Sequence, residues 1–205
     1  MKVLLINGSP HEKGCTYTAL TKVAETIREN GIETQIYHIG NKPVRGCIAC
    51  GACEKLEKCV FEDDSANEIL ELIQEADGII IGSPVYYAGP NGALCALLDR
   101  VFFSSKAERI SYKPAAAIVS ARRGGTTAAF DRLNKYFTIN RMPVVSSQYW
   151  NGVHGMTPEE VLRDEEGMQI MHTLGNNMAW MLKTLANKTE KAPEIEEWKA
   201  TNFIR

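Results

Sequence analysis

The chain has 205 residues, of which 44% are hydrophobic and 23% charged, and its formal net charge is -2 at pH 7. These values are ordinary for a globular protein and argue against intrinsic disorder, a collagen-like repeat or a coiled coil. The near-neutral charge balance gives no electrostatic reason to expect nucleic-acid binding. No apolar run approaches the about 18 residues that a membrane helix needs, and no signal peptide follows Met1. We therefore expect a cytoplasmic protein without a membrane partner.

Short apolar runs alternate with amphipathic stretches along the chain. Strands are predicted, in chain order, at residues 3–6, 32–39, 78–81, 115–119 and 144–149. Helices are predicted at residues 16–30, 65–75, 93–103 and 126–137, followed by a long helix or broken pair over 158–186, with Gly167 and Gly175 as candidate breaks. Five strands that are each followed by a helix indicate an α/β protein, with a parallel sheet and helices on both faces.

This order of elements predicts a single domain over residues 1–187. Residues 188–205 form a polar tail that also carries Trp198 and Phe203. We expect these two aromatic side chains to dock on the body of the protein or on a neighbouring subunit.

The loop between the first strand and the first helix, residues 8–18, combines glycines with hydroxyl side chains. Its glycines permit tight turns and a close approach of backbone N–H groups, while Ser9, Thr16 and Thr18 add hydroxyl donors. Because a helix N-terminus carries a partial positive charge, this loop suits a phosphate. It matches neither the nucleoside-triphosphate loop nor the dinucleotide fingerprint. The alternative is an ordinary strand-to-helix turn with a threonine cap.

Two further loops follow the third and fourth strands at the same end of the predicted sheet. Residues 82–92 are rich in glycine and proline and present the flat rings of Tyr86 and Tyr87. In residues 120–126, paired arginines stand beside paired glycines and can offer positive charge to an anionic ligand. Ligands of open parallel sheets bind beyond the carboxyl ends of the strands, where the strand order reverses. The alternative is that the tyrosines pack on a helix and the arginines are solvated.

Together the three loops resemble those of the flavodoxin-like NADPH-dependent FMN reductase family. The matching segments are residues 8–10 with 14–16, residues 82–87, the helix 93–100 that ends in Leu-Leu-Asp-Arg, and residues 124–126. The resemblance implies a flavodoxin-like three-layer sandwich, with a five-stranded parallel sheet of order 2-1-3-4-5 and one FMN in each subunit. It also implies that NADH or NADPH is the co-substrate, that a small molecule accepts the electrons, and that the protein is a homodimer or homotetramer.

The resemblance further implies which residues bind FMN, and it implies no catalytic side chain because the flavin performs the chemistry. The phosphate site would be formed by Ser9, His11, Gly14, Cys15 and Thr16. The isoalloxazine ring would be bordered by Pro84, Val85, Tyr86, Tyr87 and Gly89, and on another side by Ser120, Ala121, Arg122 and Gly125. The sequence departs from the family pattern at three positions: His11 replaces a common arginine, Cys15 a common asparagine, and Asn91 a usual serine or threonine. A neutral histidine would bind phosphate less strongly than arginine.

Four of the six cysteines lie within thirteen residues, with the spacing C-x2-C-x2-C-x5-C: Cys47, Cys50, Cys53 and Cys59. In an expected cytoplasmic protein, such a group indicates metal or redox chemistry before disulfides. Closely spaced cysteines of this kind can surround an iron–sulfur cluster, whereas structural zinc usually takes two separated pairs. The spacing resembles that of the iron–sulfur flavoproteins, which implies that the four cysteines bind a 4Fe–4S cluster. The alternative is a cluster-free relative with free thiols or a disulfide.

These features leave three functions open. The first is an FMN-dependent oxidoreductase that passes electrons from NAD(P)H to a quinone, a flavin or another acceptor. The second is an electron carrier that uses FMN and a 4Fe–4S cluster to exchange electrons with ferredoxin. The third is a phosphate- or nucleotide-binding module without redox chemistry.

Overall fold

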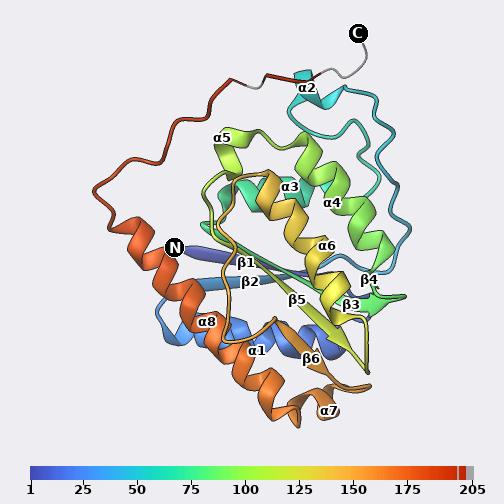
Figure 1. The fold of residues 1–205 in the computed structure, drawn as a ribbon. Helices are drawn as coiled ribbons and strands as arrows, with labels where there is room; N and C mark the ends of the chain where they lie inside the picture. Colours follow the sequence, from blue (N-terminus) through green and yellow to red (C-terminus); the bar gives the residue numbers. More distant parts are fainter. Residues whose placement is uncertain (198, 202–205) are drawn as a thin grey trace.

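A computed structural model describes residues 1–197 and 199–201, so Trp198 and Phe203 lie outside the described residues. In this part of the chain, five parallel strands form one sheet in the order β2-β1-β3-β5-β6, and the short β4 pairs antiparallel with the end of β3 (Figure 1). The predicted fold class and the order 2-1-3-4-5 of the parallel strands are therefore confirmed. The strands are β1 (Lys2–Asn7), β2 (Glu33–His38), β3 (Gly78–Tyr86), β4 (Gly89–Pro90), β5 (Ala115–Ala121) and β6 (Gly152–His154).

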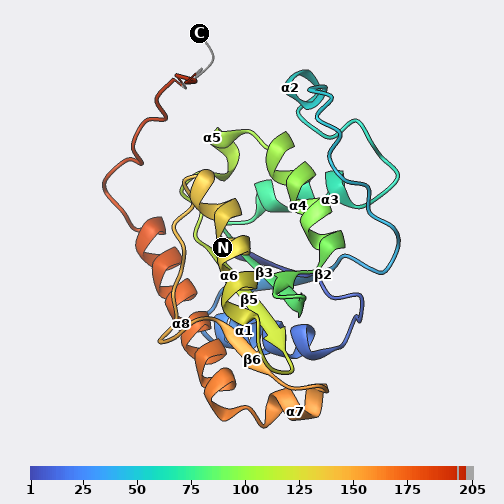
Figure 2. The same ribbon diagram turned by 45° about the vertical axis from the view of Figure 1, so that its right-hand side comes forward.

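Helices cover both faces of the sheet (Figures 1 and 2). One face packs on α1 (Cys15–Glu29), α7 (Pro158–Leu162) and α8 (Glu165–Ala186), and the other on α3 (Ala66–Glu75), α4 (Gly92–Ser104) and α6 (Thr126–Ile139). The short helix α5 (Ala107–Ile110) adds Ile110 to the core on this second face, whereas the short helix α2 (Cys53–Leu56) contributes no buried residue. Val3 and Leu5 of β1 face the α1 side, and Leu4 and Ile6 face the other core. This alternation explains the continuous apolar run, because a strand buried on both faces needs apolar residues at every position.

The edge strand of the sheet lies later in the chain than the predicted strand at residues 144–149. Val144 makes only an isolated bridge to Ala115 among the described residues, and the ladder with β5 is formed by Gly152–His154. Between these two points the chain turns away to α8, where the Ser147 hydroxyl donates to the Ile170 carbonyl at 2.7 Å. Bonds to the helix therefore replace ladder bonds to the strand over residues 146–148, and the chain returns to β5 at Asn151, whose carbonyl accepts from the Val119 N–H at 3.0 Å.

The C-terminal helical region is broken at a different place from the two glycines that the sequence indicated. The break falls at Arg163 and Asp164, where the Asp164 carboxylate accepts from the Gly167 N–H at 3.0 Å and caps α8. Gly175 instead permits close packing of α8 on α1, because a Cβ there would lie 2.6 Å from the Cβ of Thr26. None of the helices in the described part of the chain is long and apolar enough to cross a bilayer.

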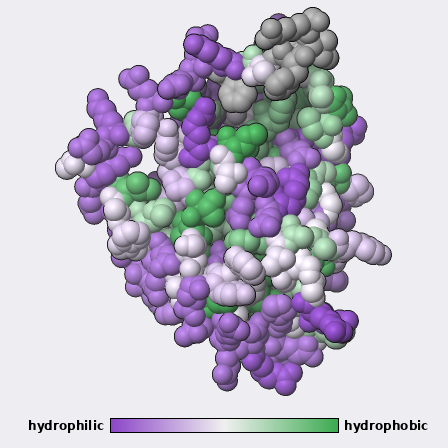
Figure 3. All heavy atoms as spheres, viewed as in Figure 1, coloured by the Kyte–Doolittle hydropathy of each residue, from purple (hydrophilic) through white to green (hydrophobic). Residues whose placement is uncertain are grey.

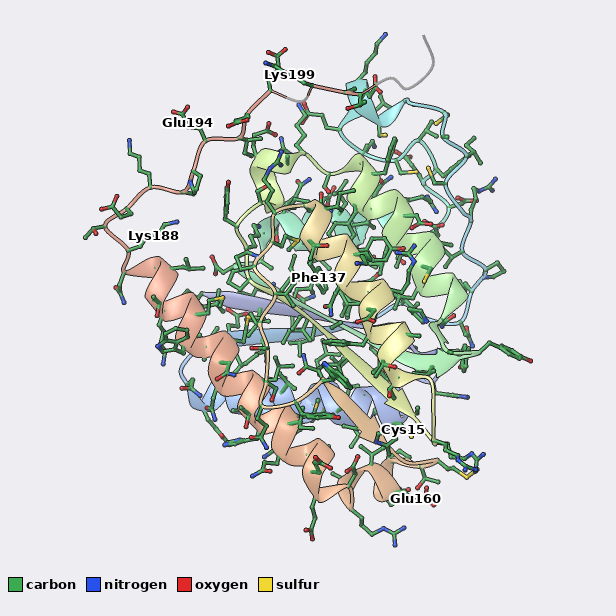
Figure 4. All side chains as sticks on the ribbon, in the orientation of Figure 1. Cys15, Phe137, Glu160, Lys188, Glu194 and Lys199 are labelled. Atoms are coloured by element: carbon green, nitrogen blue, oxygen red, sulfur yellow. The ribbon has the colours of Figure 1, made fainter. Side chains whose placement is uncertain are left out.

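The segment after α8 contains neither helix nor strand over residues 188–197 and 199–201. Figure 4 shows Lys188, Glu194 and Lys199 spaced along an extended course beyond the end of α8.

The strand β3 extends past the predicted residue 81 and folds back on itself as a tight hairpin. Tyr86 pairs with Gly89, and the two turn residues, Tyr87 and Ala88, have φ values of 51° and 60°. Turns of this kind favour Asn-Gly or Asp-Gly, so the Tyr-Ala sequence gave no hairpin signal.

Asn91 holds the loops after β1 and β3 against the start of α4. Its side-chain oxygen accepts from the Ala93 N–H at 3.0 Å and caps the helix, and its amide donates to the Gly8 carbonyl at 2.7 Å. Its backbone N–H donates to the Ser83 hydroxyl at 2.9 Å. One buried residue thus joins three segments.

Replacing Asn91 with alanine removes the cap of α4 and leaves the Gly8 carbonyl without its side-chain donor. We expect the free energy of unfolding, measured in urea, to fall by about 2–4 kcal/mol, the sum of a lost cap and an unsatisfied buried group. Asn187→Ala is the matched control, because this side chain is exposed and bonds the Lys183 carbonyl at the end of α8. Equal losses in the two variants would contradict the joining role of Asn91.

Candidate functional site

The loops after β1, β3 and β5 surround a cavity of about 480 Å³ at one edge of the sheet. They meet there because parallel strands present their carboxyl ends at a common edge, and the strand order reverses between β1 and β3. The volume lies within the range of about 300–1,000 Å³ that is usual for small-molecule sites. Eleven of the residues predicted to bind FMN line this cavity: Ser9, His11, Gly14, Cys15, Thr16, Pro84, Val85, Tyr86, Ser120, Ala121 and Arg122.

The N-terminus of α1 opens into the cavity with an uncapped first turn. Gly14 occupies the N-cap position, no side chain bonds the first turn there, and the turn contains no acidic residue. The first N–H groups of a helix lack partners within the helix, and they carry its partial positive charge. Lys13 and His11 line the same end of the cavity. This end of the cavity therefore suits a phosphate group.

Hydrogen bonds fix the first loop and connect it to the third. The Ser9 hydroxyl accepts from the His11 N–H at 3.1 Å, and the Ser9 carbonyl lies 2.8 Å from Nε2 of His38. The hydroxyls of Thr16 and Ser120 are 2.8 Å apart, and both residues are buried. The walls of the cavity are thus held in place by the protein itself, which lowers the ordering cost of binding.

Cys15 is a neutral part of the phosphate end of the cavity. Its sulfur lies 3.7 Å from the Gly155 carbonyl, and Figure 4 shows Cys15 and Glu160 at the same end of the sheet. Burial raises the pKa of the Cys15 thiol, and the carboxylates of Glu160 and Glu159 also raise it. The thiol is therefore uncharged at neutral pH and does not repel an anion.

Three of the predicted cofactor residues lie outside the lining of the cavity. Tyr87 is fully exposed at the tip of the hairpin, and Gly89 forms the returning strand of that hairpin. Gly125 supports the hairpin from behind, since its φ is +93° and a Cβ there would lie 2.8 Å from Cα of Ala88. Gly125 thus positions the wall formed by Val85 rather than forming a wall itself.

A fourth wall of the cavity was not predicted. It is formed by the segment after β6 and consists of Gly155, Met156, Thr157 and Pro158. The rule that loops gather at the carboxyl ends of parallel strands would have found it, had the last strand been placed at residues 152–154. Lys13 was also missed, although it stands within the first loop.

The four clustered cysteines lie in the cysteine loop, which we define as residues 45–64, between β2 and α3. Cys47, Cys50, Cys53 and Cys59 line one hollow at the far end of α4, together with Ile48, Val60, Phe61, Arg100 and Phe103. On the face shown in Figure 3, hydrophobic side chains gather at the upper right, where this loop lies. Exposed apolar side chains in and beside the loop are Ile48, Leu56, Val60 and Phe103.

The cysteine loop brings four thiols to the lining of one hollow. Burial raises the pKa of the Cys53 thiol, and the thiols of Cys50, Cys47 and Cys59 raise it as well. Among residues 1–197 and 199–201, no three His, Cys, Asp or Glu side chains are grouped tightly enough for a single metal ion. The four thiols line one hollow, and their compact spacing along the chain is nearer to iron–sulfur motifs than to the two separated pairs that are usual for structural zinc.

Arg100 closes the hollow from α4. Burial lowers the pKa of its guanidinium, but the Asp64 carboxylate and the Cys59 sulfur raise that pKa by more. Arg100 therefore carries a full positive charge inside the loop.

Comparisons with known proteins agree with this geometry. The chain matches the family model described as NADPH-dependent FMN reductase over residues 1–157. An iron–sulfur flavoprotein of Methanocaldococcus jannaschii is 33% identical over 196 residues, which cover 90% of this chain and 99% of that protein. An iron–sulfur flavoprotein of Methanosarcina thermophila is 31% identical over 194 residues, which cover 93% and 100%.

A solved structure shows the same fold at much lower identity. The flavoenzyme NAD(P)H:acceptor oxidoreductase FerB of Paracoccus denitrificans has a TM-score of 0.62 and 17% identity, over 89% of this chain and 97% of that one. The match of the family model and the full-length similarity to two flavoproteins together identify the chain. It belongs to the NADPH-dependent FMN reductase family, is similar to the iron–sulfur flavoproteins, and is a flavin-dependent oxidoreductase.

Proposed function

We propose that the chain binds FMN in the 480 Å³ cavity and passes electrons from NAD(P)H to a small acceptor. The observation that carries this proposal is the convergence of three loops on one cavity at the point where the strand order reverses. FMN supplies the redox chemistry when it is bound, and the protein binds, orients and shields it.

The two ends of the cavity have different tasks in this proposal. The free N–H groups of α1 and the Lys13 ammonium bind the phosphate. The segment from Pro84 to Tyr86 forms an apolar and aromatic wall that excludes water from one side of the ring. Arg122 places a positive charge at the opposite wall, where it favours negative charge on the reduced ring.

Lys13→Gln tests the assignment of the phosphate end. We expect the Kd for FMN to rise about five- to tenfold, equivalent to about 1–1.4 kcal/mol, because one cation facing the phosphate is lost. The Kd for riboflavin, which has no phosphate, should stay within about twofold. Fluorescence titration of the flavin-free protein measures both constants. The control is Lys22→Gln, which removes the same charge from α1 outside the cavity. An equal loss of affinity for FMN and riboflavin would contradict the contact between Lys13 and the phosphate.

Gly125→Ala tests whether the hairpin must hold its position. A side chain at this left-handed φ meets the Ala88 backbone, so we expect a loss of about 1–3 kcal/mol in unfolding free energy and weaker FMN binding. Gly124→Ala is the control, because a Cβ at Gly124 has nothing within 4 Å. The support role of Gly125 is wrong if both variants unfold in urea and bind FMN like the wild type.

We also propose that the cysteine loop binds a 4Fe–4S cluster through Cys47, Cys50, Cys53 and Cys59. The four thiols around one hollow support this proposal, as do the two iron–sulfur flavoproteins of similar length. A cluster in the same chain as a flavin favours a second function, in which the chain carries single electrons between FMN and ferredoxin.

Cys50→Ala separates the two cofactor sites. We expect the variant to lose most of its iron and sulfide and to keep its FMN, because the cysteine loop and the cavity lie at different ends of α4. Cys95→Ala is the control, since Cys95 lies in α4 outside the hollow. Anaerobic purification followed by iron, sulfide and flavin analysis gives the result. Loss of FMN together with iron would contradict the division into two sites.

The same preparation distinguishes the two functions. Rapid bleaching of the flavin by NADPH, followed by reoxidation with a quinone, supports the reductase. Reduction by ferredoxin but not by NADPH supports the carrier. In either case we expect a homodimer or homotetramer, which size-exclusion chromatography with light scattering measures.

A further inference from the structure

A single buried arginine organises the cysteine loop. The Arg100 side chain is 1% exposed and pairs with the carboxylate of Asp64, which is 8% exposed. Its Nη1 also donates to the Arg45 carbonyl at 3.2 Å, and its Nη2 donates to the Phe61 carbonyl at 3.4 Å. One guanidinium from α4 thus bonds both ends of the loop.

The third nitrogen of this guanidinium contacts a cysteine. Nε of Arg100 lies 3.2 Å from the sulfur of Cys59. A neutral thiol is a weak acceptor, whereas a thiolate accepts a charge-assisted bond from a cation. The contact is therefore worth most when the Cys59 sulfur carries the negative charge that metal ligation requires.

Cys59 is also held through its backbone. Its N–H donates to the side-chain oxygen of Asn67 in α3 at 2.8 Å, and its carbonyl accepts from the Asn67 amide at 3.0 Å. Cys47 and Cys50, by contrast, are exposed on the outer part of the loop. The sulfur that Arg100 contacts thus belongs to the cysteine that α3 and α4 fix together.

We propose that Arg100 is a positioning residue for the iron–sulfur cluster, which holds the Cys59 sulfur toward the hollow and raises the reduction potential of the cluster by a hydrogen bond to that sulfur. This inference rests on the proposed cluster in the cysteine loop. Mutation of residues that hydrogen-bond to metal ligands typically lowers metal affinity 10- to 100-fold. Hydrogen bonds to cluster sulfurs are among the factors that set the potential. A cation stabilises the more negative, reduced form, so its loss lowers the potential.

A variant of Asp64 distinguishes an electrostatic effect of Arg100 on the cluster from a loss of loop structure, because the two predict different directions of shift in the reduction potential. Asp64→Asn removes the negative partner and leaves Arg100 with its bond to the sulfur. The positive charge near the cluster is then less neutralised, so the potential should rise. Arg100→Gln removes the positive charge, so the potential should fall. Both variants break the same ion pair, and a residue that merely held the loop together would move the potential in one direction in both.

The experiment compares five anaerobically purified proteins: the wild type, Arg100→Gln, Arg100→Lys, Asp64→Asn and Arg45→Gln. Arg45→Gln is the matched control. The guanidinium groups of Arg100 and Arg45 both lie over the Phe61 ring, at 5.6 Å and 4.4 Å from its centroid, but that of Arg45 is half exposed and pairs with Asp63. The measurements are iron and FMN per chain, the midpoint potential of the cluster in a redox titration, and the melting temperature of the iron-free protein.

We expect Arg100→Gln to lose iron severalfold while FMN stays constant, and its remaining cluster to titrate at a lower potential. Arg100→Lys, which keeps the charge, should lie between this variant and the wild type. Asp64→Asn should shift the potential upward, and Arg45→Gln should match the wild type in both cofactors. If Arg100→Gln fails to fold, Arg100→Lys and Asp64→Asn test the inference instead: the reduction potential should fall in the first variant and rise in the second.

Three outcomes would overturn the inference. Wild-type iron and potential in folded Arg100→Gln would show that Arg100 does not act on the cluster. Shifts of the reduction potential in the same direction in the Asp64 and Arg100 variants would show that both residues act only by stabilising the loop. A wild type that binds FMN but no iron after incubation with iron and sulfide would remove the cluster and the role of Arg100 together, and would leave the flavin site intact.

Discussion

The close approach of two glycine-containing loops is the constraint on which the cavity at the carboxyl ends of the strands depends. The Gly8 N–H donates to the Gly82 carbonyl at 2.8 Å. A Cβ on Gly8 would lie 2.4 Å from the Leu94 side chain, and a Cβ on Gly82 would lie 2.9 Å from the side chains of Leu20 and Thr16. Only glycine at these positions lets α1 and α4 approach the two neighbouring strand ends. The N-terminus of α1 and the wall formed by the end of β3 are therefore brought together by backbone contact.

The helix α4 connects that cavity to the cysteine loop. Its 13 residues span about 20 Å. Asn91 fixes its first turn to the loops of the cavity, and Arg100 fixes its later part to the cysteine loop. The interior of this helix is buried at Leu94, Leu97 and Val101. A helix that is packed along its length and bonded at both ends behaves as a rigid spacer, so the two regions keep a constant separation while each retains its own set of contacts.

Much of the fold could be predicted because the strands β1, β3 and β5 are buried on both faces, and the helices around them carry apolar residues at helical spacing. The prediction was wrong where bonds to a helix decide the path of the chain, as at residues 146–148, which bond to α8 instead of β5. It also missed the hairpin at Tyr87 and Ala88, whose positive φ values are unusual for these residue types. The cavity was largely anticipated because loops after parallel strands share one edge. The wall after β6 was missed because the last strand was placed at residues 144–149 and not at 152–154.

The role of Arg100 lies beyond sequence patterning, because arginine is rarely buried and nothing in its neighbourhood along the chain predicts burial. A buried ion pair is also a poor way to stabilise a loop. Replacement of such a pair by apolar residues of similar volume is often neutral or stabilising, whereas loss of one partner costs about 3–5 kcal/mol. Apolar residues packed around Phe61 in place of Arg100 and Asp64 would therefore stabilise the loop equally well. An apolar pair cannot supply a charged N–H directed at the sulfur of Cys59, and this is the feature that distinguishes Arg100 and Asp64 from a purely structural contact.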